Sequence, residues 1–163
     1  MSAPYSVPMN LTRELSYEAG VDQVRAMLCD PAYWDKVATA TGARSSSTTV
    51  DGDTVTTDEL QEVAGVPSFA KKIVGDSTQA IKTIAWHGDT ADFRVETPGK
   101  PTSIKGTLRL DAAGTGSTLT YDLEVKASVP LVGGKLEKLV AELTDAGFTK
   151  EHEVGTAWLA GER

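Results

Sequence analysis

The hydrophobic pattern is clearest in the last quarter of the chain. From Leu119 to Val129 every second residue is apolar and the residues between them are polar. A period of two is typical of a strand with one buried face. After Pro130, apolar positions recur at spacings of three, four and seven as far as Trp158, which predicts one long amphipathic helix. The apolar stripe predicted for this helix consists of Leu136, Leu139, Val140, Leu143, Gly147, Val154 and Trp158.

Shorter patterns fill the rest of the chain. Residues 9–17 alternate and predict a first strand, and two short helices are predicted over residues 21–30 and 32–40, with Pro31 between them. A helical insert is predicted at residues 69–74, with Ser68 as its N-cap. The turns after residue 87 are too short for a crossover helix, which indicates an antiparallel meander. Further strands are predicted over residues 45–50, 54–63, 79–87, 91–97, 102–110 and 118–129.

Length and charge limit the function classes. The 163 residues predict a single domain over residues 9–160, preceded by a flexible tail over residues 1–8. A net charge of −7 repels phosphate backbones and predicts no nucleic-acid binding. No apolar run approaches the ~20 residues that span a bilayer, so no stable membrane insertion is expected. Because the N-terminus lacks a signal-peptide pattern, a cytoplasmic location is expected.

Candidate chemistry is sparse. The single cysteine, Cys29, lies in an apolar helical stretch and is interpreted as a small core residue. His87 lies at a hairpin, and His152, between two glutamates, is interpreted as a solvated helix-face residue without metal-ligand spacing. A Cys29–His152 or Ser–His pair stays an open alternative, although neither has a recognised local signature. We therefore predict no catalytic residue, no metal site and no cofactor.

Two charged side chains alternate with apolar residues and require an explanation. Arg13 shares a strand face with Leu11 and Leu15, and Glu59 shares one with Val55. If these faces line a cavity, both side chains are polar anchors for a ligand. Alternatively they lie at the rim, or a bulge reverses the register so that the residue after Glu59 points inward.

The order of strand, two short helices, further strands and one long helix resembles the START-like superfamily. This helix-grip fold is shared by polyketide cyclases, birch-pollen-type allergens and lipid-transfer domains. Residues 7–17, 69–75 and 129–140 are similar to the actinobacterial family called domain of unknown function 2505. The resemblance implies an α+β fold, in which a curved antiparallel sheet of about seven strands surrounds the long helix and two short helices close one end. It implies no assigned catalytic residues.

A cavity between the sheet and the long helix is therefore expected to hold a hydrophobic or amphipathic small molecule, such as a lipid, isoprenoid or polyketide. One alternative is a cyclase- or hydrolase-like enzyme that uses Glu59, Arg13 or Tyr121. Another is a co-chaperone or protein-interaction module with a filled core, although no protein partner is identified. For each residue listed below, the alternative interpretation is an ordinary core residue that contacts no ligand. The candidate ligand-binding residues are Arg13, Trp34, Glu59, Trp86, Phe93, Val95, Ile104, Leu108, Tyr121, Leu123, Leu139, Leu143 and Gly147.

Overall fold

The computed structural model describes residues 8–163, which form four helices and one seven-stranded antiparallel sheet. The α+β helix-grip architecture predicted from the sequence is confirmed. The predicted tail over residues 1–8 lies, apart from Pro8, outside the described residues. The strands are β1 (Met9–Tyr17), β2 (Ala43–Asp51), β3 (Thr54–Glu62), β4 (Ser77–His87), β5 (Thr90–Glu96), β6 (Thr102–Ala113) and β7 (Gly116–Ala127). The helices are α1 (Val21–Leu28), α2 (Pro31–Ala40), α3 (Ser68–Val74) and α4 (Gly133–Leu159).

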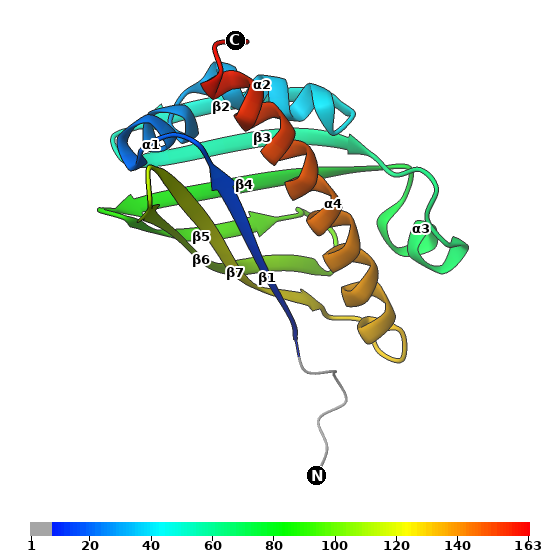
Figure 1. Cartoon of the computed structure of the whole chain (residues 1–163). Coiled ribbons are helices and arrows are strands. Elements are labelled where there is room, and N and C mark those ends of the chain that lie inside the picture. Colours follow the sequence, from blue (N-terminus) through cyan, green and yellow to red (C-terminus); the bar gives the residue numbers. More distant parts are fainter. Residues whose placement is uncertain (1–7) are drawn as a thin grey trace.

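The sheet is a meander with one additional pairing. Its strand order is β1-β7-β6-β5-β4-β3-β2, so the first strand pairs with the last and β2 forms the opposite edge. The β1–β7 register pairs Arg13 with Tyr121 and Leu15 with Leu119. Helices α1 and α2 carry the chain from one edge of the sheet to the other (Figure 1). This connection is why the two helices close one end of the sheet.

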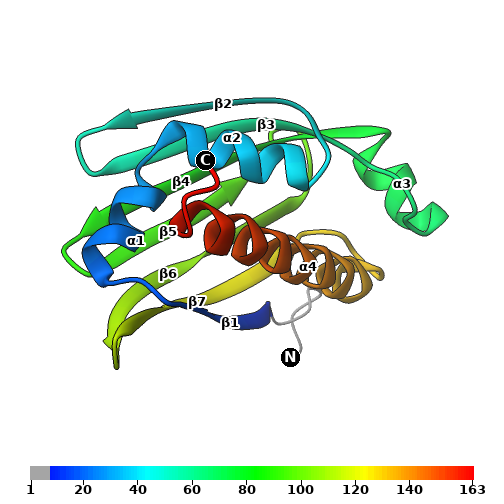
Figure 2. The same cartoon turned by 45° about the horizontal axis from the view of Figure 1, so that its top comes forward.

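Helix α4 crosses the concave face of the sheet diagonally (Figure 1). It packs against β1 and β7, and its C-terminal part lies beside α2 (Figure 2). Helix α3 lies at the other end of the sheet, away from α1 and α2 (Figure 1). The main core therefore fills the layer between the concave face, α2 and the C-terminal part of α4.

A glycine in β6 allows close strand packing. A Cβ atom at Gly106 would lie 2.1 Å from the carbonyl oxygen of Asp122, so no side chain fits there. Glycine within a strand often marks close backbone approach or a bend. Gly106 pairs with Phe93 on one side and with Leu123 on the other. A residue without a side chain at this position leaves room for these two large inward side chains where the sheet curves.

Two local predictions are wrong. Leu143 does not lie on the buried stripe of α4, because its side chain is 54% exposed. The buried face instead includes Glu137, Phe148 and Glu151. The predicted stripe was wrong here because it was assigned from apolar residue types alone and so left out the two buried glutamates. Ser68 is not the N-cap of α3, since Pro67 occupies that position without a side-chain hydrogen bond.

Candidate functional site

A buried carboxyl group lies at the centre of the molecule. Glu151 is on the face of α4 that packs on the sheet and is only 4% exposed. The hydroxyl of Tyr121, on β7, donates a hydrogen bond of 2.5 Å to Glu151 Oε2. The hydroxyl of Tyr33, on α2, donates to the Glu151 backbone carbonyl at 3.2 Å. Burial raises the pKa of Glu151, although the Lys82 charge and the Tyr121 hydrogen bond act in the opposite direction.

Aromatic packing holds Tyr121 in place. Its side chain is fully buried. The Phe148 ring stacks on it with a centroid separation of 4.1 Å, and the Phe93 ring meets it edge-on at 5.6 Å. Burial, and then the nearby Glu151 charge, raise the pKa of Tyr121 well above its ordinary value. The phenol therefore remains protonated and acts as a fixed donor to Glu151.

A lysine lies on the concave face near this pair. Lys82 alternates on β4 with Ile84 and Trp86, which are both buried. Its Nζ lies 3.4 Å from the centroid of the Trp34 ring. Desolvation lowers the pKa of Lys82, against the opposing charges of Glu151 and Glu59. No ion pair within 4.0 Å joins Lys82 to a carboxylate among residues 8–163.

The two charged residues singled out in the sequence lie in different environments. Arg13 lies at the rim, where its Nη1 is 2.8 Å from Asp145 Oδ1 and its Nη2 donates to Thr149 Oγ1 at 3.1 Å. Its side chain is 29% exposed, as the rim alternative predicts. Glu59 lies on the inward face of β3, because the β3–β4 register runs without a bulge. Its Oε2 accepts a hydrogen bond of 2.7 Å from Gln61.

The other predicted residues divide by burial. Most are buried together in the main core, namely Trp34, Trp86, Phe93, Ile104, Leu108, Tyr121 and Leu123. Val95 and Leu139 are partly exposed, and Leu143 is exposed. A Cβ atom at Gly147 would have no other heavy atom within 4 Å. Whether any of these residues contacts a ligand stays a prediction.

The sequence analysis missed Glu151 and Lys82. Both have side chains that are normally exposed, and Glu151 lies beside His152, which was interpreted as solvated. The spacing in the sequence indicated the burial of Glu151. Glu151 lies three residues after Phe148 and seven before Trp158, and these spacings place all three residues on the same face of a helix. Lys82 likewise alternates with Ile84. Testing whether a charged residue continues an apolar stripe would have identified both.

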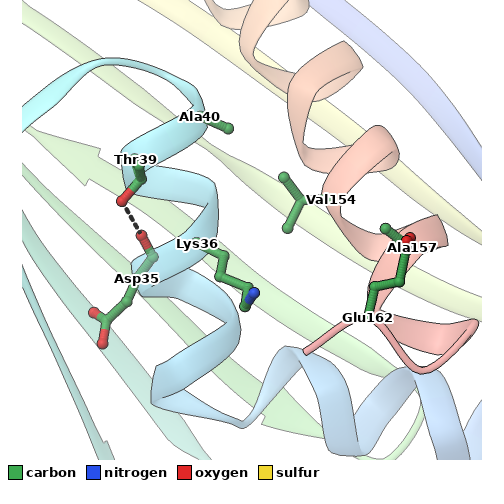
Figure 3. Close-up of a pocket in the computed structure, with 7 residues that line it drawn as sticks. All are labelled: Asp35, Lys36, Thr39, Ala40, Val154, Ala157 and Glu162. Atoms are coloured by element: carbon green, nitrogen blue, oxygen red, sulfur yellow. Dashed lines mark hydrogen bonds between the residues drawn. The ribbon is translucent and has the colours of Figure 1, made fainter.

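A separate surface pocket lies between α2 and the end of α4 (Figure 3). Its volume is about 500 Å³ and it is open to solvent. Its apolar wall includes Val154 and Ala157 from α4, and the Lys36 side chain extends from α2 into the space between the helices (Figure 3). None of the predicted ligand-binding residues lines it.

Residues 8–163 contain neither a metal-ligand cluster nor a membrane-spanning helix. Within residues 8–163 no group of three or more His, Cys, Asp or Glu side chains is arranged to hold a metal ion. None of the helices in that range has the length and apolar character to cross a membrane.

Comparison with protein families identifies the relatives. The family model described as "Protein of unknown function (DUF2505)" matches residues 12–159. The chain belongs to the DUF2505 family. Its sequence is similar to an uncharacterized protein of Mycobacterium tuberculosis, with 22% identity over 170 residues that cover 94% of this chain and 98% of the relative.

Solved structures share the fold of this DUF2505 chain. A START superfamily protein from Mycobacterium smegmatis superposes with a TM-score of 0.59 at 16% identity, covering 92% of this chain and 98% of that one. The di-domain ARO/CYC StfQ from the steffimycin biosynthetic pathway gives a TM-score of 0.69 at 11% identity, covering 94% of this chain and 51% of that one. At these identities the similarity establishes the fold alone.

Proposed function

We propose that the protein binds a small amphipathic molecule between the concave face of the sheet and α4. Its polar end meets the Glu151–Tyr121 pair, and its apolar body lies along the inward side chains of β4, β5 and β6. The observation that carries this proposal is the buried carboxyl–phenol pair, which lies among the apolar side chains of the main core.

The pair is costly for a purely structural role. Burying a carboxyl group costs several kcal/mol unless it is well paired, and an apolar residue on α4 would fill the same position. The raised pKa of Glu151 favours its protonated form. A protonated carboxyl both donates and accepts hydrogen bonds, so it suits a ligand hydroxyl or carbonyl group.

Part of the concave face is exposed to solvent. Lys82, Glu59 and Val95 point inward but remain partly exposed. They lie on β3, β4 and β5, whereas α4 packs on β1 and β7. Leu139 on α4 is also partly exposed. We propose that ligands enter between this part of the sheet and α4.

Thermal denaturation with naphthylmethanol tests the proposal, because this probe combines an apolar ring system with one hydroxyl group. We expect it to raise the Tm of the wild-type protein and to form a 1:1 complex in native mass spectrometry. Val95→Trp should abolish the effect by filling the inward face of β5. Arg94→Trp is the matched control, because Arg94 is exposed on the opposite face of the same strand.

The same purified protein should be extracted under denaturing conditions to identify any resident molecule. A stoichiometric lipid or polyketide in the extract would support binding and reveal the ligand class. An apo mass together with an unchanged Tm for naphthylmethanol and for a lipid panel would contradict the proposal. That result would favour the protein-interaction alternative.

An enzyme of the cyclase or hydrolase kind is the second candidate function. The observation that favours it is the buried Glu151, whose pKa desolvation raises and which lies within the electrostatic influence of Lys82. Shifted pKa values in buried surroundings are common among acid–base groups of enzymes. One structural neighbour is a di-domain ARO/CYC from the steffimycin biosynthetic pathway, which is compatible with chemistry in this fold. Turnover of a substrate found in the extract would distinguish this candidate from simple binding.

A further inference from the structure

Lys82 has an unusual position for a lysine. It projects from the concave face of β4, where its register partners are Thr57 on β3 and Val95 on β5. Its Nζ lies over the Trp34 ring, and no hydrogen bond from Nζ is found to any of residues 8–163. The charged groups that influence it are Glu151 from α4 and Glu59 from β3. The amine is therefore available to a molecule that occupies the interior.

We propose that Lys82 Nζ is the nucleophile of a covalent site for aldehydes and ketones, with Glu151 as the acid that protonates the carbonyl oxygen. This inference rests on the proposed function, because a carbonyl compound must first occupy the same interior. It names the ligand class as carbonyl compounds with an apolar body.

The reaction is a reversible condensation that needs no other reactant. The Nζ lone pair attacks the carbonyl carbon and forms a C–N bond, while the π electrons move to the oxygen, which takes a proton from Glu151. Nζ returns one proton to the Glu151 carboxylate, which gives a neutral carbinolamine. The hydroxyl group then leaves as water after a second protonation, and loss of the remaining Nζ proton gives a neutral imine. The overall products are one imine and one water.

The surroundings favour a carbonyl ligand over an anionic one. A ligand carboxylate beside Lys82 would be repelled by Glu59 and by any ionised Glu151. A carbonyl group carries no such penalty. Lysines in desolvated surroundings supply the free amine that imine formation requires. The Trp34 ring, whose centroid lies 3.4 Å from Nζ, fixes the position of the amine on the concave face.

Competitive reductive methylation is the first test, because it compares every lysine in one sample. The folded wild-type protein is treated with limiting formaldehyde and cyanoborohydride at pH 7, and peptide mass spectrometry gives the rate at each lysine. We expect Lys82 to react faster than Lys105, which is exposed on the outer face of β6. A slower or equal rate at Lys82 would overturn the inference without requiring any variant to fold.

Trapping with naphthaldehyde and cyanoborohydride is the second test. We expect one adduct, located at Lys82, which is lost in Lys82→Met and retained in the control Lys105→Met. Glu151→Gln keeps an acceptor for Tyr121 but removes the acid, and should slow trapping about 100-fold. An unchanged rate in Glu151→Gln would remove Glu151 from the mechanism.

The naphthylmethanol experiment separates the two proposals. If naphthylmethanol raises the Tm of wild type and Lys82→Met while naphthaldehyde labels lysines evenly, binding stands and the covalent site is wrong. If neither compound raises the Tm and Lys82 is not selectively trapped, both proposals fail.

Discussion

Helix α4 carries two buried glutamates in different surroundings. Glu137, near its N-terminal end, is 1% exposed, and its Oε2 accepts a hydrogen bond of 2.9 Å from the backbone N–H of Ala127. Glu151 lies about four turns further along. It accepts a hydrogen bond from the Tyr121 hydroxyl and lies within the electrostatic influence of Lys82.

The nature of the partner separates the two roles. The Ala127 N–H lies at the end of β7 and is buried, and Glu137 gives this backbone donor an acceptor. Glu137 therefore joins strand to helix. The backbone needs no side-chain acceptor at Glu151, and its phenol partner is itself a buried polar group. Burial alone does not distinguish a structural carboxylate from a functional one, whereas the partners do.

The largest expected effect tests whether the Glu151 end of α4 is packed as a core. Phe148→Ala removes the ring stacked on Tyr121, and we expect a loss of about 3–5 kcal/mol of unfolding free energy in urea. Leu143→Ala, on the exposed side of the same helix, should stay within about 0.5 kcal/mol. A cost below about 1 kcal/mol for Phe148→Ala would mean that this end is loosely packed.

The next effect concerns the structural glutamate. Glu137→Ala leaves the Ala127 N–H buried without its carboxylate acceptor, so we expect a loss of about 2–3 kcal/mol of unfolding free energy. Glu142→Ala, at an exposed position of α4, is the control and should have little effect. Amide hydrogen exchange should also show faster exchange at Ala127. Unchanged exchange there would contradict the role assigned to Glu137.

The third effect tests the hydrogen bond that holds Glu151. Tyr121→Phe keeps the aromatic packing and removes the donor, so we expect a loss of about 1–2 kcal/mol. Tyr33→Phe, which removes a longer hydrogen bond to the Glu151 backbone, should cost less. Urea unfolding of both variants measures the difference. If Tyr33→Phe cost more, the short Tyr121 contact would contribute little.

The sheet and α4 were predictable because their patterns are local. Residues 9–17 alternate, with Arg13 as the one charged residue on the apolar face, and the strand predicted there has the bounds found for β1. The short turns made the meander predictable as well. The pairing of β1 with β7 joins residues more than 100 positions apart, as in Met9 with Val125, and local patterns contain no information about it.

Of the three residues at the centre of the candidate site, one was predicted from the sequence and two were not. Tyr121 was predicted, because its position in an alternating strand placed a hydroxyl group inside. Glu151 and Lys82 were missed because residue type argued for exposure, and their burial depends on how α4 and α2 pack over the sheet. Charged residues inside apolar patterns therefore mark positions to examine for function.

The smallest effect, and the sharpest comparison, is the pH dependence of Glu151→Gln. The pKa of Glu151 is raised from 4.5 in the folded protein, so unfolding releases a proton at pH values between 4.5 and the folded pKa. The stability that Glu151 contributes is then complete below about pH 4.5 and declines as pH rises through the folded pKa. Glutamine cannot ionise and keeps an acceptor for Tyr121.

We therefore expect Glu151→Gln to gain unfolding free energy relative to wild type as the pH rises above 4.5, as measured by urea unfolding at several pH values. Glu153→Gln, at an exposed position two residues away, should show no such trend. The opposite slope, in which wild type gains on the glutamine variant as pH rises, would mean that the fold favours an ionised carboxylate at residue 151. Glu151 would then not serve as a proton donor in the folded protein.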